Sequence, residues 1–145
     1  MNETIRKFGY PATLIGETAQ WVVLLRPAQV TLGSLVVAAK SDATAFGALP
    51  AECHADLAEV SRRVEAMLQA AVSYERINWL MLMMVDPNVH FHVLPRYEGQ
   101  RSHGALTVAD SGWPGPPDLK SAVALSEAQQ AELEQWLRGL WSETA

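Results

Sequence analysis

The stretch that decides the fold is Asn88-Val89-His90-Phe91-His92-Val93-Leu94-Pro95-Arg96. Apolar and polar residues alternate along it, which is typical of a β-strand with one buried face. The apolar residues at 89, 91 and 93 then point into the core, and Asn88, His90 and His92 share the opposite face. Neighbouring side chains on that face have Cβ atoms roughly 6.5–7 Å apart. The pattern therefore predicts a row of two imidazoles and one carboxamide along a single strand.

Three kinds of chemistry fit this row. The simplest is a solvated polar face without a ligand. The second is a metal site, in which His90 and His92 are two ligands and His103 or an acidic residue is the third, because catalytic zinc usually has three protein ligands. The third is nucleophilic catalysis. A neutral imidazole attacks phosphorus and forms a phospho-imidazole, which water then cleaves.

The flanking sequence predicts a sheet and two helices. Two short strands are expected over Ala12–Ile15 and Gln20–Leu25, around a turn at Gly16, and a third strand over Ser34–Ala39. Apolar residues at three- and four-residue steps predict an amphipathic helix over Ala51–Val72. Arg76–Val85 is apolar on both faces, which favours a central strand covered on both sides.

The C-terminal third begins with a segment, 96–118, that has no clear periodicity. A loop of this length is uncommon unless it is functional or packs on a partner. Ser126 with Gln129 forms a capping-box pattern, which predicts the start of a final helix over about 126–142. The chain is expected to be one α+β domain, 1–145, with its core over about 10–97: an antiparallel sheet, one long helix and a C-terminal helix.

Composition excludes several classes of protein. The 145 residues are 49% hydrophobic and 19% charged, as in a globular protein, and the net charge is −5. No cluster of basic residues is longer than Arg62-Arg63, so neither a nucleic acid nor a membrane surface is the expected partner. Cys53 is the only cysteine and the N-terminus lacks an apolar signal-peptide core, which favours the cytoplasm.

The residues quoted at the start resemble the signature of the histidine triad superfamily, His-φ-His-φ-His-φ-φ, often followed by Pro-Arg, where φ is apolar. The resemblance extends upstream through Trp21–Leu25 and Val30–Lys40, which look like the family's strand, turn and second strand. It covers about Leu14 to Tyr97. Such proteins are usually homodimers that hydrolyse or transfer nucleotides at the α-phosphate through a histidine intermediate, without a cofactor.

The resemblance implies a role for individual residues. His90 matches the family's nucleophile, and His92 matches the histidine that assists and orients it. Arg96 matches the arginine after the signature, a structural or phosphate-adjacent residue.

Four departures distinguish this sequence from the family's pattern. Asn88 replaces the first histidine, and an amide carries neither a proton nor a charge for the reaction. Ser34 replaces a histidine after Gly33. Arg26 stands where an Asp or Asn usually holds the ribose hydroxyls, and because arginine only donates it suits a phosphate or carboxylate instead. The link from Met83 to Asn88 is short, as if a Gly-rich segment were deleted.

These residues together predict a divergent phosphohydrolase or nucleotidyl transferase. The expected catalytic residues are His90 and His92, and the expected substrate-binding residues are Asn88, Arg26, Ser34 and Arg96. The substrate class is a dinucleoside polyphosphate, a nucleoside phosphoramidate or another phosphorylated small molecule, with no cofactor or metal. The alternatives are a weakened nucleotide or phosphometabolite binding protein and a histidine-based metal-binding protein. A homodimer is expected in each case.

Overall fold

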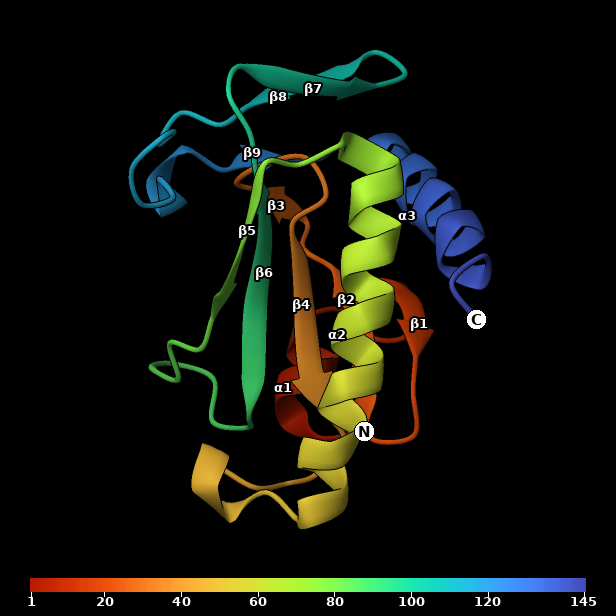
Figure 1. Ribbon diagram of the computed structural model, residues 1–145, viewed down its shortest axis with the longest axis vertical. Coiled ribbons are helices and arrows are strands. Elements are labelled where there is room, and N and C mark those ends of the chain that lie inside the picture. The colour runs from red at the N-terminus through yellow and green to blue at the C-terminus, as the bar shows by residue number, and fades with distance from the viewer.

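The computed structural model covers residues 1–145 and is built on one five-stranded antiparallel sheet (Figure 1). The strands are ordered β1-β2-β4-β6-β5 across the sheet. Their bounds are β1 (Leu14–Glu17), β2 (Trp21–Leu25), β4 (Leu35–Ala39), β5 (Arg76–Leu80) and β6 (His90–Arg96). Each neighbouring pair is antiparallel, which confirms the predicted α+β class.

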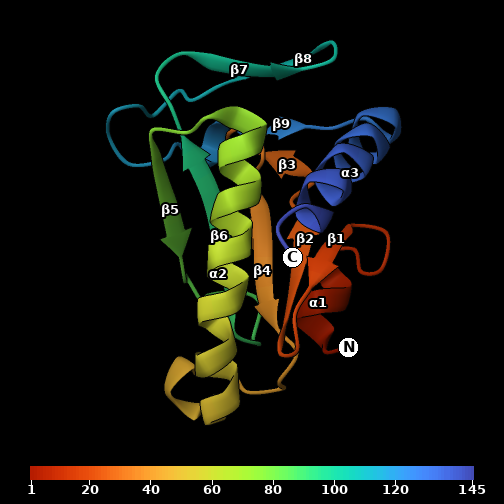
Figure 2. The same ribbon diagram turned by 45° about the vertical axis from the view of Figure 1, so that its right-hand side comes forward.

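The two long helices, α2 (Ala51–Val72) and α3 (Glu127–Ser142), pack on the same side of the molecule (Figure 2). The buried residues of α2 lie at helical spacing, among them Val60, Val64 and Met67, and they form one core with the inner face of the sheet. The bounds of α2 agree with the prediction. The helix α3 begins after Ser126 with both bonds of the capping box, as expected.

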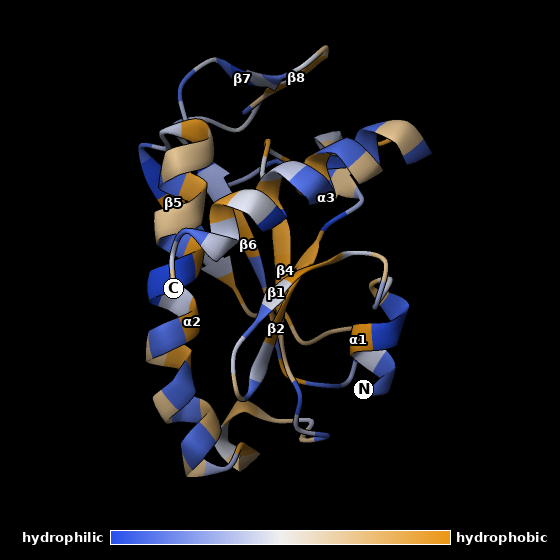
Figure 3. Cartoon of the chain, turned by 90° about the vertical axis from the view of Figure 1, so that its right-hand side faces the viewer, coloured by the Kyte–Doolittle hydropathy of each residue, from blue (hydrophilic) through white to orange (hydrophobic).

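A short helix, α1 (Glu3–Lys7), lies against the opposite face of the sheet, and Figure 3 shows the strands between α2 and α1. Asn2 is its N-cap, because its side chain accepts a hydrogen bond from the backbone N–H of Ile5. Ile5 is fully buried and packs on four apolar residues of β2 and β4: Val22, Leu24, Val36 and Ala38. This helix was not predicted from the sequence, and it covers the face that carries the histidines.

Smaller elements complete the fold. The strands β3 (Ala28–Gln29) and β9 (Val123–Ala124) pair with each other, as do β7 (Gln100–His103) and β8 (Leu106–Ala109). Two 3₁₀ turns lie at Phe46–Ala48 and Leu119–Ser121. The β7–β8 hairpin extends beyond the end of the sheet in Figure 1. It falls in the segment 96–118, where no element was predicted.

Two expectations about the sheet were wrong. Arg76–Val85 is not a central strand: β5 ends at Leu80 and forms the edge of the sheet, and Met84 and Val85 are 85% and 81% exposed. Gly16 does not form the turn between the first two strands, because it lies inside β1. A Cβ at Gly16 would be 2.2 Å from Nε1 of Trp141, so this glycine allows α3 to approach the strand closely.

Candidate active site

The two histidines lie on the face of the sheet that α1 covers. In the register of β6 with β4, His90 is opposite Ala38 and His92 is opposite Val36, and residues directly opposite each other share a face. Ala38 and Val36 both belong to the apolar cluster around Ile5. The imidazole rings are 5.2 Å apart between centroids and meet edge to face. The predicted row of imidazoles is therefore present, on the side of the sheet away from α2.

The ring of His90 is held in one orientation and one tautomer. Its Nδ1 lies 2.8 Å from the backbone carbonyl oxygen of Asn88. Because a carbonyl only accepts, Nδ1 must carry the proton, which leaves the lone pair on Nε2. The side chain is 2% exposed, yet Nε2 has no hydrogen-bond partner in the chain and is not fully enclosed. His90 thus presents an oriented nucleophilic nitrogen.

His92 is held neutral by its surroundings. Burial, the Arg26 guanidinium and the His90 ring lower the pKa of His92 to about 4, against an opposing effect of Asp86. Its Nδ1 is buried and has no hydrogen-bond partner. At neutral pH this ring can therefore act as a hydrogen-bonding and orienting group, but it is not the imidazolium acid that would protonate a leaving group.

The lowered pKa of His92 predicts a loss of stability in acid. The unfolded chain binds a proton at this residue below about pH 6.5, whereas the folded chain does not until the pH approaches about 4. The unfolded state therefore binds more protons over this range, and stability falls as the pH falls through it. We expect the wild-type Tm to drop more between pH 7 and pH 4.5 than the Tm of His92→Gln. The exposed His54→Gln is the control, and equal drops in all three proteins would contradict the prediction.

The side chain of Asn88 is engaged within the fold. Its Oδ1 accepts hydrogen bonds from the backbone N–H and the hydroxyl of Thr4, at 3.2 and 3.0 Å, and its Nδ2 donates to the carbonyl of Asp42 at 3.0 Å. The Thr4 hydroxyl also accepts from the Asn88 backbone N–H at 3.0 Å. The sequence predicted that this side chain contacts the substrate. In the structure its amide instead joins the start of β6 to the N-terminal helix.

Phe8 is the main site residue that sequence reasoning missed. Its ring lies 5.6 Å from the centroid of His90 and 5.8 Å from that of His92. Gly9 follows directly after this C-cap residue of α1, with φ +95°, a conformation that favours glycine. An ion pair between Lys7 and Asp86 ties the end of α1 to the loop before β6. The N-terminal segment therefore forms one wall of the histidine site.

Arg26 lies near His92 and has no acidic partner. It is half-buried, and only Nη1 has a partner in the chain, the carbonyl oxygen of Ala28 at 2.5 Å. No carboxylate lies within 4.0 Å of it, since it takes part in none of the ion pairs of the structure. Burial lowers the pKa of Arg26, and its charge acts on His92. Arg26 and the Phe8 ring line one cavity, so Arg26 is joined to the histidine site through Phe8.

Ser34 has a different role from the expected substrate contact. It is fully buried at the turn before β4. Its hydroxyl donates to the carbonyl of Thr31 at 2.7 Å and accepts from the Thr31 backbone N–H at 3.1 Å. Ser34 therefore closes a turn, and no hydroxyl group remains for a ligand.

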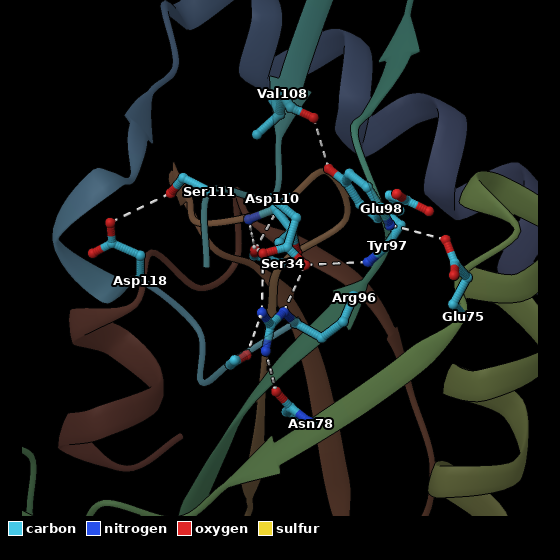
Figure 4. Close-up of polar contacts among 12 residues, drawn as sticks. Ser34, Glu75, Asn78, Arg96, Tyr97, Glu98, Val108, Asp110, Ser111 and Asp118 are labelled. Carbon is cyan, nitrogen blue, oxygen red and sulfur yellow. Dashed lines mark hydrogen bonds and ion pairs between the residues drawn. The ribbon is translucent and has the colours of Figure 1, made fainter. Parts of the chain in front are cut away.

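Arg96 likewise serves the fold (Figure 4). It forms a buried ion pair with Asp110, from Nε at 2.7 Å and from Nη2 at 3.0 Å. It also donates to Asn78 Oδ1 at 2.8 Å and to the carbonyl of Gly115 at 2.9 Å. This network fixes the loop after β8 to the end of β6. All the guanidinium nitrogens are engaged, so the expected phosphate contact would have to displace one of these bonds.

Solved structures with a similar fold are known. A histidine triad protein from Marinobacter aquaeolei matches with a TM-score of 0.76 and 22% identity, over 100% of this chain and 97% of that chain. A histidine triad protein from Sinorhizobium meliloti matches with a TM-score of 0.73 and 22% identity, over 96% of this chain and 94% of that chain. A hypothetical histidine triad nucleotide-binding protein from Sulfolobus tokodaii matches with a TM-score of 0.74 and 17% identity, over 97% of this chain and 90% of that chain. No protein-family model and no curated protein sequence matches the chain.

The chain has the histidine triad fold. Within that fold, two other candidate residues, His103 and Cys53, are engaged or buried elsewhere. His103 is on β7 and stacks on Trp136 of α3, with ring centroids 3.9 Å apart, so it is not a third ligand for His90 and His92. No group of three potential metal-ligating side chains is present. Cys53 is buried, and burial raises the pKa of its thiol.

Proposed function

We propose that this histidine triad fold cleaves or transfers at phosphorus in a nucleotide or another phosphorylated small molecule, through a covalent intermediate on His90. The observation that supports this most directly is the state of the His90 ring. Its Nδ1–H is bound to the Asn88 carbonyl, and its Nε2 is unpartnered next to the neutral His92. An oriented neutral imidazole is the nucleophile that such a reaction requires.

The proposed reaction has two steps. His90 Nε2 forms a bond to phosphorus while the bond to the leaving oxygen breaks, and the electron pair leaves with that oxygen. The phosphorylated ring becomes cationic, and the carbonyl of Asn88 at 2.8 Å stabilises the proton on Nδ1. A water oxygen then attacks phosphorus, the electron pair of the P–N bond returns to Nε2, and the proton of the water passes to solvent. His92 orients the ring and the phosphoryl group.

This site favours leaving groups that need no proton. The amide of Asn88 cannot protonate a leaving group, and it is occupied by Thr4 and Asp42. His92, with a pKa of about 4, is unprotonated near pH 7. A phosphate anhydride leaves as a stable anion, whereas the amine of a phosphoramidate must be protonated. We therefore propose a dinucleoside polyphosphate or a similar anhydride as the substrate class, ahead of phosphoramidates.

A second candidate is a nucleotide or phosphometabolite binding protein with little turnover. The observation that favours it is the same engagement of Asn88, together with the Phe8 ring against both histidines. With the Asn88 amide engaged, only His90 and His92 remain for catalysis, whereas a complete triad would provide three histidines. Binding without turnover is the outcome that separates this candidate from the enzyme.

Intact-mass spectrometry tests the proposal. The protein is mixed with dinucleoside polyphosphates and with adenosine phosphoramidate and is quenched within seconds. We expect a nucleotidyl adduct with the anhydrides, less or none with the phosphoramidate, and none in His90→Ala. Bound nucleotide without adduct or product would favour the binding protein. Absence of any binding would reject this substrate class.

The partner and location that we propose follow from charge and composition. The net charge of −5 and the absence of a basic cluster favour a small phosphorylated ligand over a nucleic acid. Cys53 is the only cysteine, so no disulfide forms within the chain, as is usual for a cytoplasmic protein. No helix of the structure has the length and hydropathy to span a bilayer.

We propose that a second copy of the chain pairs along β5. This strand is at the edge of the sheet, where its outer backbone groups have no partner strand. Leu82, Met84 and Val85, just after it, are exposed. A hollow of about 300 Å³ between α2 and the sheet is lined by Leu57, Trp79 and Phe91 among others. An unpaired edge beside exposed apolar residues is typical of a contact between subunits.

Sedimentation or light scattering at micromolar concentration checks the dimer. We expect the wild type to have twice the mass of one chain, and Leu82→Glu combined with Met84→Glu to shift it to monomer. Both side chains are exposed, so the fold should be unaffected. The matched control introduces the same charges on the outer face of α2, as Ala58→Glu with Ala51→Glu. A wild-type monomer would contradict the prediction, as would equal behaviour of the two variants.

A further inference from the structure

A cavity of about 390 Å³ opens beside the histidine site, between the N-terminal segment and the residues after β2. Phe8 and Pro27 give it apolar walls, Gln130 of α3 borders it, and the side chains of Lys7 and Arg26 bring cations to it. Phe8 also contacts both histidines, whereas neither histidine lines the cavity. The cavity is therefore next to the proposed reaction centre and is not part of it.

The two cations of the cavity differ in their pairing. Lys7 is neutralised by its ion pair with Asp86. Arg26 has no carboxylate within 4.0 Å, and of its donors only Nη1 has a partner in the chain. Glu134, on the same helix as Gln130, receives a hydrogen bond from Gln130 Nε2 at 3.1 Å and forms no ion pair with Arg26. Arg26 is thus the cation in this cavity without a counter-ion.

Arg96 provides the comparison within the same chain. Where the fold itself uses an arginine, it surrounds the guanidinium with Asp110, Asn78 and a backbone carbonyl. Partial burial of a cation without such partners costs free energy, which an anion bound at the same place would offset. The planar fork of Arg26 suits an oxyanion with two acceptor oxygens, such as a phosphate or a carboxylate.

We propose that this cavity binds a second anionic group of the ligand, a phosphate or a carboxylate, through Arg26. The inference rests on the proposed function, since it places the reacting phosphorus at His90 and the second anion on the other side of Phe8. The ligand then has two charged parts. A molecule whose only charged group is the reacting phosphate would leave Arg26 without a counter-ion, so it should bind less tightly than a ligand with two anionic groups.

Titration with anions alone tests this without a known substrate. Inorganic pyrophosphate and, separately, succinate are added to ¹⁵N-labelled protein. The Arg26 Nε–H signal is followed by NMR in the wild type, and the backbone amide signals of Phe8 and Ala28, which line the cavity, are followed in the wild type and in every variant. We expect saturable binding of at least one anion, weakened about tenfold or more in Arg26→Gln and weakened by added salt. The control is Arg62→Gln, on the exposed face of α2, which should bind as the wild type does. The anion that binds more tightly identifies the phosphate or the carboxylate as the source.

Two results would overturn the inference. The first is an absence of saturable binding of both anions to the wild type, and the second is unchanged affinity in Arg26→Gln. If Arg26→Gln does not fold, Arg26→Lys replaces it, because it keeps the charge and loses the fork, and an intermediate affinity is expected. His90→Ala separates this test from that of the proposed function. The His90→Ala protein should bind pyrophosphate or succinate with the wild-type affinity, whether or not the wild type forms an adduct with a nucleotide.

Discussion

Replacing His90 with alanine is expected to lower kcat by at least about 10⁴-fold, because it removes the atom that bonds to phosphorus. Substrate affinity should change far less, since the proposed contacts of Arg26 and the walls of its cavity remain. The measurement is single-turnover cleavage of a dinucleoside polyphosphate, with binding measured separately by calorimetry. The mass of the adduct should be absent in the variant at every time point.

His103→Ala is the matched control for this loss. His103 is stacked on Trp136, and its removal should leave the rate within a few-fold of wild type. Because His90 is 2% exposed, the Tm of each variant is measured to confirm that it folds. If a folded His90→Ala protein retained the wild-type rate, the covalent mechanism would be excluded.

Replacing Asp110 with alanine should destabilise the fold by about 3–5 kcal/mol, the usual cost of removing one partner of a buried ion pair. Asp110 accepts from Arg96 through both carboxylate oxygens and from the backbone N–H of Tyr97 at 3.1 Å. The side chains of the pair are 4% and 2% exposed, so the guanidinium would be left buried without its counter-ion. Urea unfolding at pH 7 measures the free energy of unfolding.

Glu75→Ala is the control for the ion pair. Glu75 is 3.8 Å from Arg101, and the two side chains are 43% and 27% exposed, so its loss should cost about 1 kcal/mol or less. A double variant, Arg96→Met with Asp110→Leu, should recover a large part of the loss, because apolar residues of similar volume need no counter-ion. Similar losses of unfolding free energy in Asp110→Ala and Glu75→Ala would contradict the prediction, because the buried pair would then stabilise the fold no more than the exposed one.

The elements predicted well are those with strong local signals. The apolar residues of α2 repeat at helical spacing and Pro50 precedes the helix, so both of its ends could be predicted. The start of α3 is defined by Ser126 and Gln129, which form the capping box in the structure. In β6, strict alternation placed the two histidines on one face, and the register with β4 confirms this.

Elements whose formation depends on tertiary contacts were missed. The helix α1 has five residues, too few for a periodic pattern, and it is held by the burial of Ile5 on the sheet. In β7–β8, the alternation of buried Leu106 and Val108 with exposed neighbours spans only four residues. The apolar run after Leu80 gave the wrong position for β5, because hydropathy does not distinguish a buried residue from one exposed at an edge.

The same division applies to the site. His90 and His92 share a strand, so their proximity follows from spacing alone. Arg26 was predicted as a site residue because it stands at the position where the family has an Asp or Asn. Phe8 and Thr4 are more than 80 residues away from the histidines in sequence, and no local pattern indicates such a contact. Asn2 as the N-cap, Glu3 in the first turn, and Arg6 and Lys7 in the last turn are sequence signals for a short helix here, but they do not indicate where it docks.

The bonds between Thr4 and Asn88 also set an order of assembly. They join residues 84 positions apart, so synthesis must continue well past the middle of the chain before the N-terminus meets its last partners. Ile5 finds its apolar neighbours within the first 38 residues, whereas Phe8 must await His90 and His92. A nascent chain that ends before β6 therefore has an N-terminal helix that is only half docked. Closing so long a loop costs more entropy than forming local contacts does, so we expect the pocket beside the histidines to be among the last parts of the molecule to form.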